Sequence, residues 1–440
     1  MVGNPISSLL RLAPGGLVLA FALPGAAALA AQGSVHVVAP GQSGAFEDVQ
    51  AAVDAAASGD VILVRTPATS SFVVDGKSLH ILGDLPVAPV CAAPSSGDNT
   101  MDDTSAHNVV RNLAPGQVTV VRGLELAGLE VADVLGAVWI EDCTIGRFAP
   151  AMRATGCSRL VLTGVAIAGP DGSVDVGVTD VVHAGRALEL AHSRAVIRES
   201  TLQGGDGLPY SVTLLGDLPN GPGREALHVT GGSLWMSGGA LTGGDGGAGG
   251  VDAFGACTDG GAGGTALRLE AGEPLVTLQG TTPVGGEGGP AGCLDAPAAP
   301  GEDGPPSSTS SGQIKHSFQR VSHLHLTGSG GTPAVREHER LQLLVECQPG
   351  DTVLLLIAGS PGITMPSNVI GPLLVGTPLQ LLWLGTSGSS HELSLSVQAP
   401  ELGSQLQEVV ELFLQAVIVP TQRPGVGGGA TSVVLLDASL

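Results

Sequence analysis

The sequence is poor in aromatic and basic residues. It holds seven Phe, three Trp and one Tyr in 440 residues, and its 18 Lys and Arg stand against 40 Asp and Glu. A net charge of −22 offers nothing that would attract a nucleic acid or an anionic membrane surface, because both are polyanions. We therefore predict no nucleic-acid partner, and the charge suits cations or a basic partner instead.

Long apolar runs are also scarce. The longest, GGLVLAFALPGAAALA, covers residues 15–30. Its length of about 16 residues falls short of the roughly 20 that a membrane-spanning helix needs. Arg11 precedes it, and Ala28-Leu29-Ala30 offers the small residues that a signal peptidase accepts. We predict a signal peptide over residues 1–31, no membrane span in the mature chain, and export to the periplasm, the cell surface or the medium.

Cysteine is sparse as well. None of the six cysteines lies in a Cys-x-x-Cys pair, so the spacing of a zinc ribbon is absent. Export would permit disulfides. Cys257 and Cys293 each lie in a Gly-rich segment just after a repeated motif, and we predict a disulfide between them. Six cysteines allow 15 connectivities in principle, so the state of the other four stays open.

Glycine is the residue in excess. There are 68, about double the ordinary share of roughly 7%, and many belong to one repeated unit. Four stretches align without gaps: RLVLTGVAIAGPDG (159–172), RAVIRESTLQGGDG (194–207), SLWMSGGALTGGDG (233–246) and LVTLQGTTPVGGEG (275–288). The acids of the four units then form one column: Asp171, Asp206, Asp245 and Glu287. Each unit offers two strand arms, and stacked units bury a continuous core that no single unit could bury.

The units recur at unequal intervals because residues are inserted after each acid. A bare coil needs about 22 residues, the spacing from Ile145 to Ile167. The insertions are rich in Gly, Pro, Ser and Asp and cover residues 173–186, 208–224, 247–265 and 289–313. When each insertion follows the same position of the repeated unit, all the insertions project from the same side of the stacked coils. We therefore predict a single ridge of loops, a place where function often lies.

The N-terminal part of the mature chain, residues 35–64, reads as a strand, a short amphipathic helix and a second strand. Phe46, Val49 and Val53 follow helical spacing, and Gly59 ends the helix. The stretch resembles the N-terminal cap of right-handed parallel β-helix proteins, the pectin-lyase-like superfamily. The matching residues are Phe46, Val49, Ala52, Val53, Ala56, Gly59, Asp60 and Ile62. The resemblance implies a helix that covers the open end of the coil, where unpaired strand edges would invite aggregation.

The composition changes after residues 295–312. From about residue 337, apolar strands alternate with Gly and Pro turns, as in an antiparallel sandwich. This stretch resembles a C-terminal β domain that recurs in secreted proteins of planctomycete-type bacteria, on the motifs PGDTVLLLIAGSPG, GPLLVG and LFLQAVIV. The predicted fold is all-β. A right-handed parallel β-helix with a capping helix and Gly-rich loop insertions covers residues 35–330, and a small antiparallel β-sandwich covers residues 337–440.

The acidic column has two interpretations. Stacked coils lie about 4.8 Å apart, so the four carboxylates could share a cation such as calcium, which takes oxygen ligands. Alternatively, Asp-Gly is turn chemistry, in which Asp caps the backbone and Gly takes a positive φ. The fuller repeat that binds calcium in other coils is missing. We therefore favour a repeated corner, keep calcium as the alternative, and predict no required cofactor.

Two histidines form a second candidate site. His323 and His325 in SHLHL point to one face of a strand, and two such imidazoles could hold a metal with help from His316 or His338. The sequence shows no fixed third ligand. A solvated face is therefore the favoured interpretation.

Catalytic motifs are absent. Enzymes of the resembled superfamily cut acidic polysaccharides, either with Asp-held calcium and a base or with clustered Asp beside Gly-His-Gly and Arg-x-Lys motifs. Neither motif occurs here, Asp102-Asp103 lies in a polar loop, and IKHS at 314–317 has no matching acid cluster. We predict no catalytic residue and a non-catalytic structural or adhesive module that binds carbohydrate or cell-surface components. The alternative is a polysaccharide-binding or polysaccharide-cleaving protein.

Overall fold

The protein is described here by a computed structural model. It describes residues 33–92, 107–174, 181–213, 216–218, 220–252, 254–293, 298–317, 323–328, 334–366, 369–376, 380–389, 391–399, 409–420 and 425–437. The predicted signal peptide, residues 1–31, and the Asp102-Asp103 pair lie outside these ranges. Within them the chain is nearly all β with one α-helix, and that helix is too short to cross a membrane.

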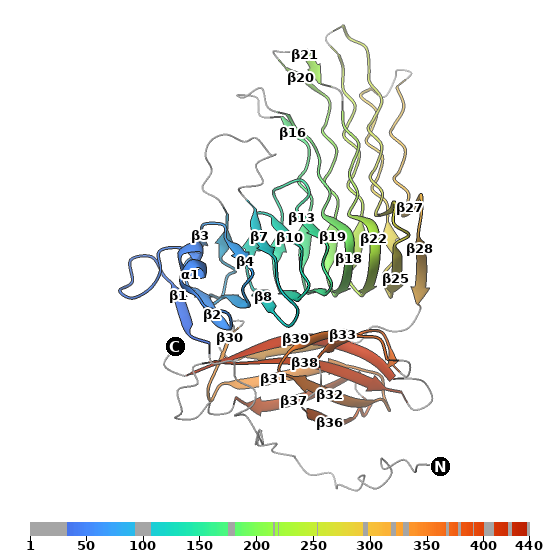
Figure 1. Cartoon of the computed structure of the whole chain (residues 1–440). Helices are drawn as coiled ribbons and strands as arrows, with labels where there is room; N and C mark the ends of the chain where they lie inside the picture. Colours follow the sequence, from blue (N-terminus) through green and yellow to red (C-terminus); the bar gives the residue numbers. More distant parts are fainter. Residues whose placement is uncertain are drawn as a thin grey trace.

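Up to residue 317, the chain passes in turn through three rows of parallel strands (Figure 1). The first row holds β1 (Val35–Val38), β2 (Asp60–Val64), β5 (Leu79–Gly83), β8 (Val118–Arg122), β11 (Ala137–Glu141), β14 (Leu160–Thr163), β18 (Leu188–Arg198), β22 (Leu227–Ser237), β25 (Leu275–Gln279) and β28 (Gln313–Ser317). The second row holds β4 (Val73–Asp75), β7 (Asn108–Arg111), β10 (Leu129–Ala132), β13 (Met152–Thr155), the first halves of β18 and β22, β24 (Leu267–Leu269) and β27 (Ser307–Thr309).

The third row holds β3 (Ala68–Thr69), β6 (Val90–Cys91), β9 (Glu125–Leu126), β12 (Thr144–Ile145), β15 (Ala166–Ala168), β19 (Thr201–Gln203), β23 (Ala240–Thr242) and β26 (Pro283–Val284). Two small hairpins lie in the insertions: β16 (Ser173–Val174) with β17 (Val181–Val182), and β20 (Ser211–Thr213) with β21 (Gly216–Leu218). The repeated units pair in one parallel register, as predicted, with Val161 beside Val196 and Val196 beside Trp235. We call these three rows the stack.

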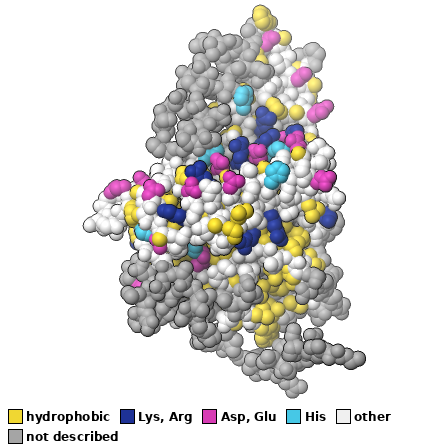
Figure 2. All heavy atoms as spheres, in the orientation of Figure 1, with side chains coloured by type: hydrophobic (Ala, Val, Ile, Leu, Met, Phe, Trp, Pro, Cys, Tyr) yellow, Lys and Arg dark blue, Asp and Glu magenta, His cyan; other side chains and the backbone are white. Residues whose placement is uncertain are grey.

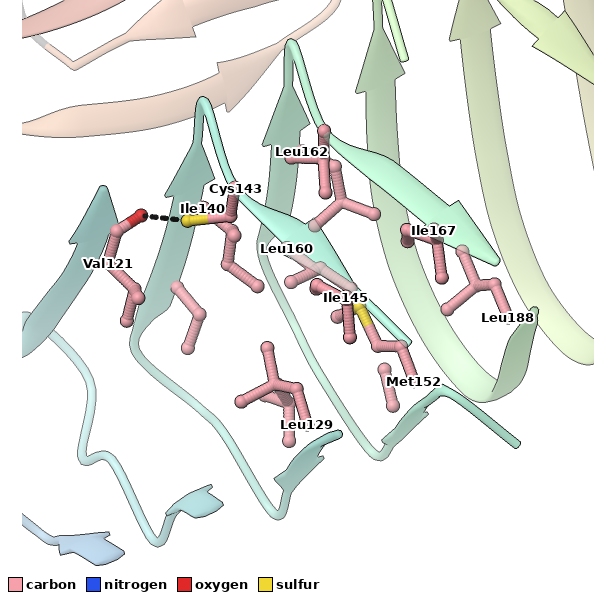
Figure 3. Packing of buried hydrophobic residues seen from close by; sticks show 14 of the residues in the cluster. Val121, Leu129, Ile140, Cys143, Ile145, Met152, Leu160, Leu162, Ile167 and Leu188 are labelled. Carbon is pink, nitrogen blue, oxygen red and sulfur yellow. Dashed lines mark hydrogen bonds between the residues drawn. The ribbon is translucent and has the colours of Figure 1, made fainter. Parts of the chain in front are cut away.

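The interior of the stack is filled by aliphatic side chains in columns. Ile140, Leu162 and Ile197 are register partners on successive strands, and all three are buried. Figure 3 shows Ile140 and Leu162 from the first row converging with Ile145 and Ile167 from the third. A column of similar branched side chains fits the roughly 4.8 Å strand spacing, which accounts for the scarcity of aromatics.

The helix α1 (Val49–Ala55) lies at the N-terminal end of the stack. Asp48 caps it by accepting a hydrogen bond from the N–H of Ala51, at 2.8 Å. Val49, Ala52 and Val53 are buried and join the interior of the stack. The predicted helix and its buried face are present, but Phe46 lies before the helix, where it pairs with Val38, and the helix ends at Ala55 and not at Gly59.

The C-terminal strands form separate sheets. The smaller is antiparallel: β29 (Leu324–Gly328), β31 (Arg340–Glu346) and β37 (Glu392–Gln398). The larger holds β30 (Ala334–Arg336), β39 (Gly425–Leu436), β38 (Val409–Val419), β32 (Thr352–Ala358) and β36 (Gln380–Thr386), with β34 (Val369–Ile370) at its side; β33 (Pro361–Thr364) pairs with β35 (Leu373–Val375). The larger sheet is mixed rather than wholly antiparallel, because β30 and β34 pair in parallel with β39 through long connections.

The larger C-terminal sheet is buried on both faces. One face shares a core with the smaller sheet, where Leu343 and Val345 meet Leu355 and Leu414. The other face covers the first row of the stack (Figure 1). There the rings of Trp139 and Phe413 meet edge to face, with centroids 5.2 Å apart. Strands buried on both faces read as near-continuous apolar runs, as β38 and β39 do.

Candidate functional site

The insertions after the acidic column are not loose loops. Gly-rich segments run side by side and project from the stack on the side away from the C-terminal sheets (Figure 1). Their main chains bond between layers at every third residue, from Gly204 N–H to the Thr242 carbonyl at 3.0 Å and from Gly207 N–H to the Asp245 carbonyl at 2.7 Å. The next layer repeats this spacing with the pairs Gly243–Val284, Gly246–Glu287 and Gly249–Pro290. Three residues per turn is the period of a polyproline-II helix.

We call these segments the glycine blade. It comprises residues 169–172, 184–186, 204–210, 220–225, 243–250, 258–265, 285–292 and 299–306. Outgoing and returning segments also bond to each other, as from Gly261 N–H to the Gly247 carbonyl at 2.8 Å. A Cβ on Gly246 would lie 1.9 Å from the carbonyl oxygen of Gly261. As on the crowded axis of collagen, only glycine fits at such positions.

This geometry corrects the prediction of a repeated corner. In an Asp-Gly turn the glycine after the acid takes the positive φ, but Gly172, Gly207, Gly246 and Gly288 are all described and none of them does so. The chain continues straight through the motif into the blade. Glycine is needed for close approach between neighbouring main chains and not for a turn.

The four acids do stand in one column. The N–H of Asp206 bonds to Oδ1 of Asp171 at 2.9 Å, and the N–H of Asp245 bonds to Oδ1 of Asp206 at 2.8 Å. The N–H of Glu287 bonds to Oδ1 of Asp245 at 2.8 Å. Each Asp therefore caps a main-chain donor of the following layer.

The charges in this column repel each other. Partial burial raises the pKa of Asp206, and the neighbouring carboxylates of Asp171 and Asp245 raise it further, against the hydrogen bond from the N–H of Asp245. In the part of the chain that the structure describes, the column does not bring three ligand atoms within 4.8 Å of one another. Calcium binding by Asp171, Asp206, Asp245 and Glu287 stays a prediction.

The far end of the blade is tied and carries apolar side chains. A disulfide joins Cys257 to Cys293, with Cα atoms 5.8 Å apart, and so links one layer to the next. Between the outgoing and returning segments, Phe254 is 94% exposed and Val251 is 47% exposed. The carboxylate of Asp252 accepts the N–H of Phe254 at 2.9 Å and orders this tip. The thiols of Cys91, Cys143 and Cys157 are buried in the stack.

Two positions in the last described layer of the blade are blocked where a further layer would bond. Gly260 donates its N–H to the Ala299 carbonyl of the last layer. The equivalent position in that layer is Pro300, which has no N–H. The N–H of Gly288 is taken by Oδ1 of Asp303 at 2.9 Å. Blocked edges of this kind oppose the addition of further chains.

The histidine pair gains the third ligand that the sequence did not reveal. Glu199, in the corner between β18 and β19, places Oε1 at 3.1 Å from Nδ1 of His323. The rings of His323 and His325 stack with centroids 6.0 Å apart. One ligand atom each from Glu199, His323 and His325 lies within 4.8 Å of the others, whereas His316 and His338 stand outside this cluster. The nearby carboxylate of Glu199 raises the pKa of His323, against its partial burial.

Glu199 occupies an unusual backbone position. Its φ is +51°, and its register equivalents on either side are Gly164 and Gly238, which also have positive φ. A non-glycine residue in the left-handed region costs about 1 kcal/mol or more. Asp142, two layers before Glu199, adopts the same conformation and bonds its carboxylate to Arg122, so an acid at this corner goes with a partner for its side chain.

An acid–base cluster also lies beside the stack, but it is covered. Glu141 accepts hydrogen bonds from Trp139 Nε1 at 2.8 Å and from both the N–H and Oγ of Ser432 at 2.8 Å, and another from the hydroxyl of Thr431. Its side chain is 3% exposed. Arg122 bonds Asp142 beside it. Because the larger C-terminal sheet lies over this cluster, no polymeric substrate reaches it.

The outer face of the second row carries an open line of charges, visible across the middle of the molecule in Figure 2. Glu225 lies 3.1 Å from Arg186 and 2.9 Å from Arg268, and Glu270 lies 3.1 Å from His228. Burial acts against ionisation of Glu225, but a main-chain hydrogen bond and the guanidinium groups hold its pKa below the ordinary value. A carboxyl that is ionised in this way is unsuited to act as a general acid.

One groove opens between the stack and the C-terminal sheets. Its volume is about 320 Å³, and Trp235, Arg194, Met365 and Pro372 are among its lining residues. Of the described residues that line it, Arg194 is the ionisable one, so the groove holds no carboxylate. It could bind a small apolar or sugar ligand, but it lacks an acid–base pair for cleavage.

The sequence was compared with protein-family models and with curated proteins. No protein-family model matches the chain, and no curated protein matches its sequence.

Proposed function

We propose that the chain is an exported, non-catalytic adhesive or binding protein that presents the glycine blade to carbohydrate or cell-surface components. In this proposal the stack is a right-handed parallel β-helix of the pectin-lyase-like kind, capped by α1 and followed by a C-terminal β-sandwich. The in-register rows of parallel strands support the β-helix. The signal-like residues 1–31 support export.

The single observation that carries the proposal is the order of the blade. Its main chains bond to each other in every layer, so its tip is held rigidly away from the body of the protein. Asp252 fixes the tip by accepting the N–H groups of Phe254 at 2.9 Å and Ala256 at 2.7 Å. A preordered, exposed aromatic ring loses little entropy on binding. The apolar face of a sugar ring is a suitable partner for Phe254.

A glycan array and a cell-surface binding assay test this proposal. The mature chain is compared with Phe254→Ser and with Val87→Ser, a matched control because Val87 is 79% exposed and lies outside the blade. We expect binding that Phe254→Ser reduces at least about tenfold, which corresponds to about 1.4 kcal/mol, and that Val87→Ser leaves unchanged. Equal binding by all three proteins would contradict a role for the tip.

The absence of catalysis is tested separately. The acid–base cluster at Glu141 is covered, and Glu225, which is itself buried between Arg186 and Arg268, has a lowered pKa. We expect no unsaturated products and no new reducing ends when the chain is incubated with acidic polysaccharides, with or without calcium. Release of either product would favour the polysaccharide-cleaving alternative.

The groove at Trp235 favours a second candidate, polysaccharide binding beside the stack. An indole at the edge of a groove of about 320 Å³ is a suitable platform for one or two sugar units. Trp235→Ala distinguishes the two sites on the same glycan array. Loss of binding in Trp235→Ala but not in Phe254→Ser would move the binding site from the blade to the groove.

A further inference from the structure

We propose that Glu199, His323 and His325 bind a transition-metal ion of the zinc type, which clamps the stack to the C-terminal sheets. This site is independent of the function proposed for the blade. Glu199 belongs to a corner of the stack, whereas His323 directly precedes β29 and His325 lies on it. The ligands are therefore far apart in the sequence and come from two different sheets.

The distances suit a tetrahedral ion. Zinc binds imidazole nitrogen and carboxylate oxygen at about 2.0–2.2 Å, so two of its ligand atoms lie about 3.4 Å apart. Oε1 of Glu199 and Nδ1 of His323 are already 3.1 Å apart, and the three ligand atoms of the cluster all lie within 4.8 Å. Two imidazoles and one carboxylate suit zinc, copper or nickel, whereas calcium and magnesium prefer sites built from oxygen alone.

The outer side of the His323 ring also has a suitable neighbour. With Nδ1 directed at Glu199, Nε2 lies 3.8 Å from Oε2 of Glu346. Metal-bound histidines commonly direct the second ring nitrogen at a carboxylate, which orients the ring and makes it a better ligand. Glu346 lies at the end of β31, the strand that pairs with β29, so the C-terminal sheet itself supplies this neighbour.

The backbone at Glu199 gives an independent indication. The neighbouring corners hold Gly164 and Gly238 in the same left-handed conformation, where a side chain is unfavourable. Glu199 is 15% exposed at its side chain and directs its carboxylate at the histidines. A metal ligand at this corner accounts for a glutamate where glycine would be more stable.

Thermal unfolding of the full mature chain tests the site, after chelator treatment and again with zinc chloride. We expect zinc to raise Tm by a few degrees and one ion to bind per chain. Glu199→Gly should abolish this rise and leave the metal-free Tm equal to or above that of the wild type, because glycine suits the left-handed backbone. His325→Ala, at an exposed residue, should also abolish it, whereas His316→Ala, an exposed histidine outside the cluster, should not.

Cobalt(II) provides a second readout that does not depend on stability. In a tetrahedral site it absorbs visible light strongly, so titration of the wild type should give a saturating band that Glu199→Gly and His325→Ala lack. A zinc-dependent rise in Tm that survives in both variants, or no rise in the wild type, would overturn the proposal.

Discussion

The stack and the glycine blade share one register but are held together by different groups. In the stack, buried side chains such as Ile140 and Leu162 fill the interior. In the blade, main chains bond directly to each other, and glycine occupies the positions of closest approach. The pairing of β19 with β23 continues without a break into the bond from Gly204 to Thr242. Order established by side chains in the stack is thus propagated outwards mainly by backbone bonds, with help from side chains such as Asp206 and Asn220.

The difference determines which substitutions matter in each region. In the stack, a substitution acts through the group that it removes, because every interior contact depends on a side chain. In the blade, it acts through the atoms that it adds, because a Cβ meets a neighbouring carbonyl oxygen. Four predictions test this contrast, ordered by expected effect.

The largest effect is expected on the covered face of the stack. Glu141→Leu removes the acceptor that Trp139, Thr431 and Ser432 share and leaves buried donors and Arg122 without it. Loss of one partner from a buried charged network costs about 3–5 kcal/mol. The free energy of unfolding in urea measures this loss. Glu189→Leu is the control, because Glu189 makes an ion pair with Arg153 on the open face and should lose less than about 1 kcal/mol. Equal losses in both variants would remove the distinction between the two faces.

The second prediction concerns a buried pair on the same covered face. Nδ1 of His80 and Oε1 of Glu411 lie 3.1 Å apart but are not aligned for a hydrogen bond. Burial lowers the pKa of His80 from 6.5 to about 4, and burial, with Glu141 nearby, raises the pKa of Glu411 well above 4.5. Both shifts favour the uncharged form of the group in the folded protein.

The two groups make opposite contributions to the pH dependence of stability. Below pH 6.5 the unfolded chain protonates His80 and the folded chain does not, so His80 lowers stability as pH falls to about 4, by up to about 3 kcal/mol. Glu411 keeps a proton in the folded state that the unfolded chain loses above pH 4.5, so it lowers stability as pH rises. Relative to the wild type, His80→Phe should lose stability with rising pH in this window and Glu411→Gln should gain it. Parallel pH profiles for both variants would contradict the opposite directions of the two pKa shifts.

The third prediction breaks the blade by adding one methyl group. Gly246 has no positive φ, so Gly246→Ala is unfavourable only because its Cβ would lie 1.9 Å from the carbonyl oxygen of Gly261. Overpacking of this kind costs about 1–3 kcal/mol. We expect faster amide exchange and proteolysis over residues 243–265, with the stack unaffected. Ala248→Ser, at the third position of the same repeat, should leave both rates unchanged, and an equal effect of the two variants would contradict the steric explanation.

Much of the stack could be predicted from the sequence. The gap-free alignment of four units placed the acids in one column, because parallel strands without bulges keep their register. The structure shows that column in the bonds between Asp171, Asp206 and Asp245. The α1 residues Val49 and Val53 are buried as their helical spacing predicts.

Three features could not be predicted because they depend on contacts between distant segments. A glycine needed for close approach looks like a glycine needed for a turn, although the three-residue period of GGDGGAGG at 243–250 was an available signal. Glu199 meets His323 only through packing of the C-terminal sheets. Its signal is a glutamate between the corners held by Gly164 and Gly238, in a column where Asp142 is the other acid with a positive φ. The larger C-terminal sheet covers the first row of the stack, and the available signal for this was the apolar residues that face outward from that row, such as Trp139.

The smallest effect is expected in the acidic column, where the side-chain oxygen and not the charge makes the contact. Asp206→Asn and Asp245→Asn each keep Oδ1, which accepts an N–H of the next layer, and remove repulsion that raises the pKa of Asp206. We expect each to change stability by less than about 0.5 kcal/mol. Asp206→Ala, which loses the acceptor, should cost about 1 kcal/mol.

If the column instead binds calcium, a site filled to 100 times its dissociation constant adds about 2.7 kcal/mol to stability. That gain would vanish in the double variant Asp206→Asn, Asp245→Asn. Melting of the wild type and the double variant, with calcium and with chelator, separates the two interpretations, and a large calcium shift confined to the wild type would make this edge of the blade a metal site.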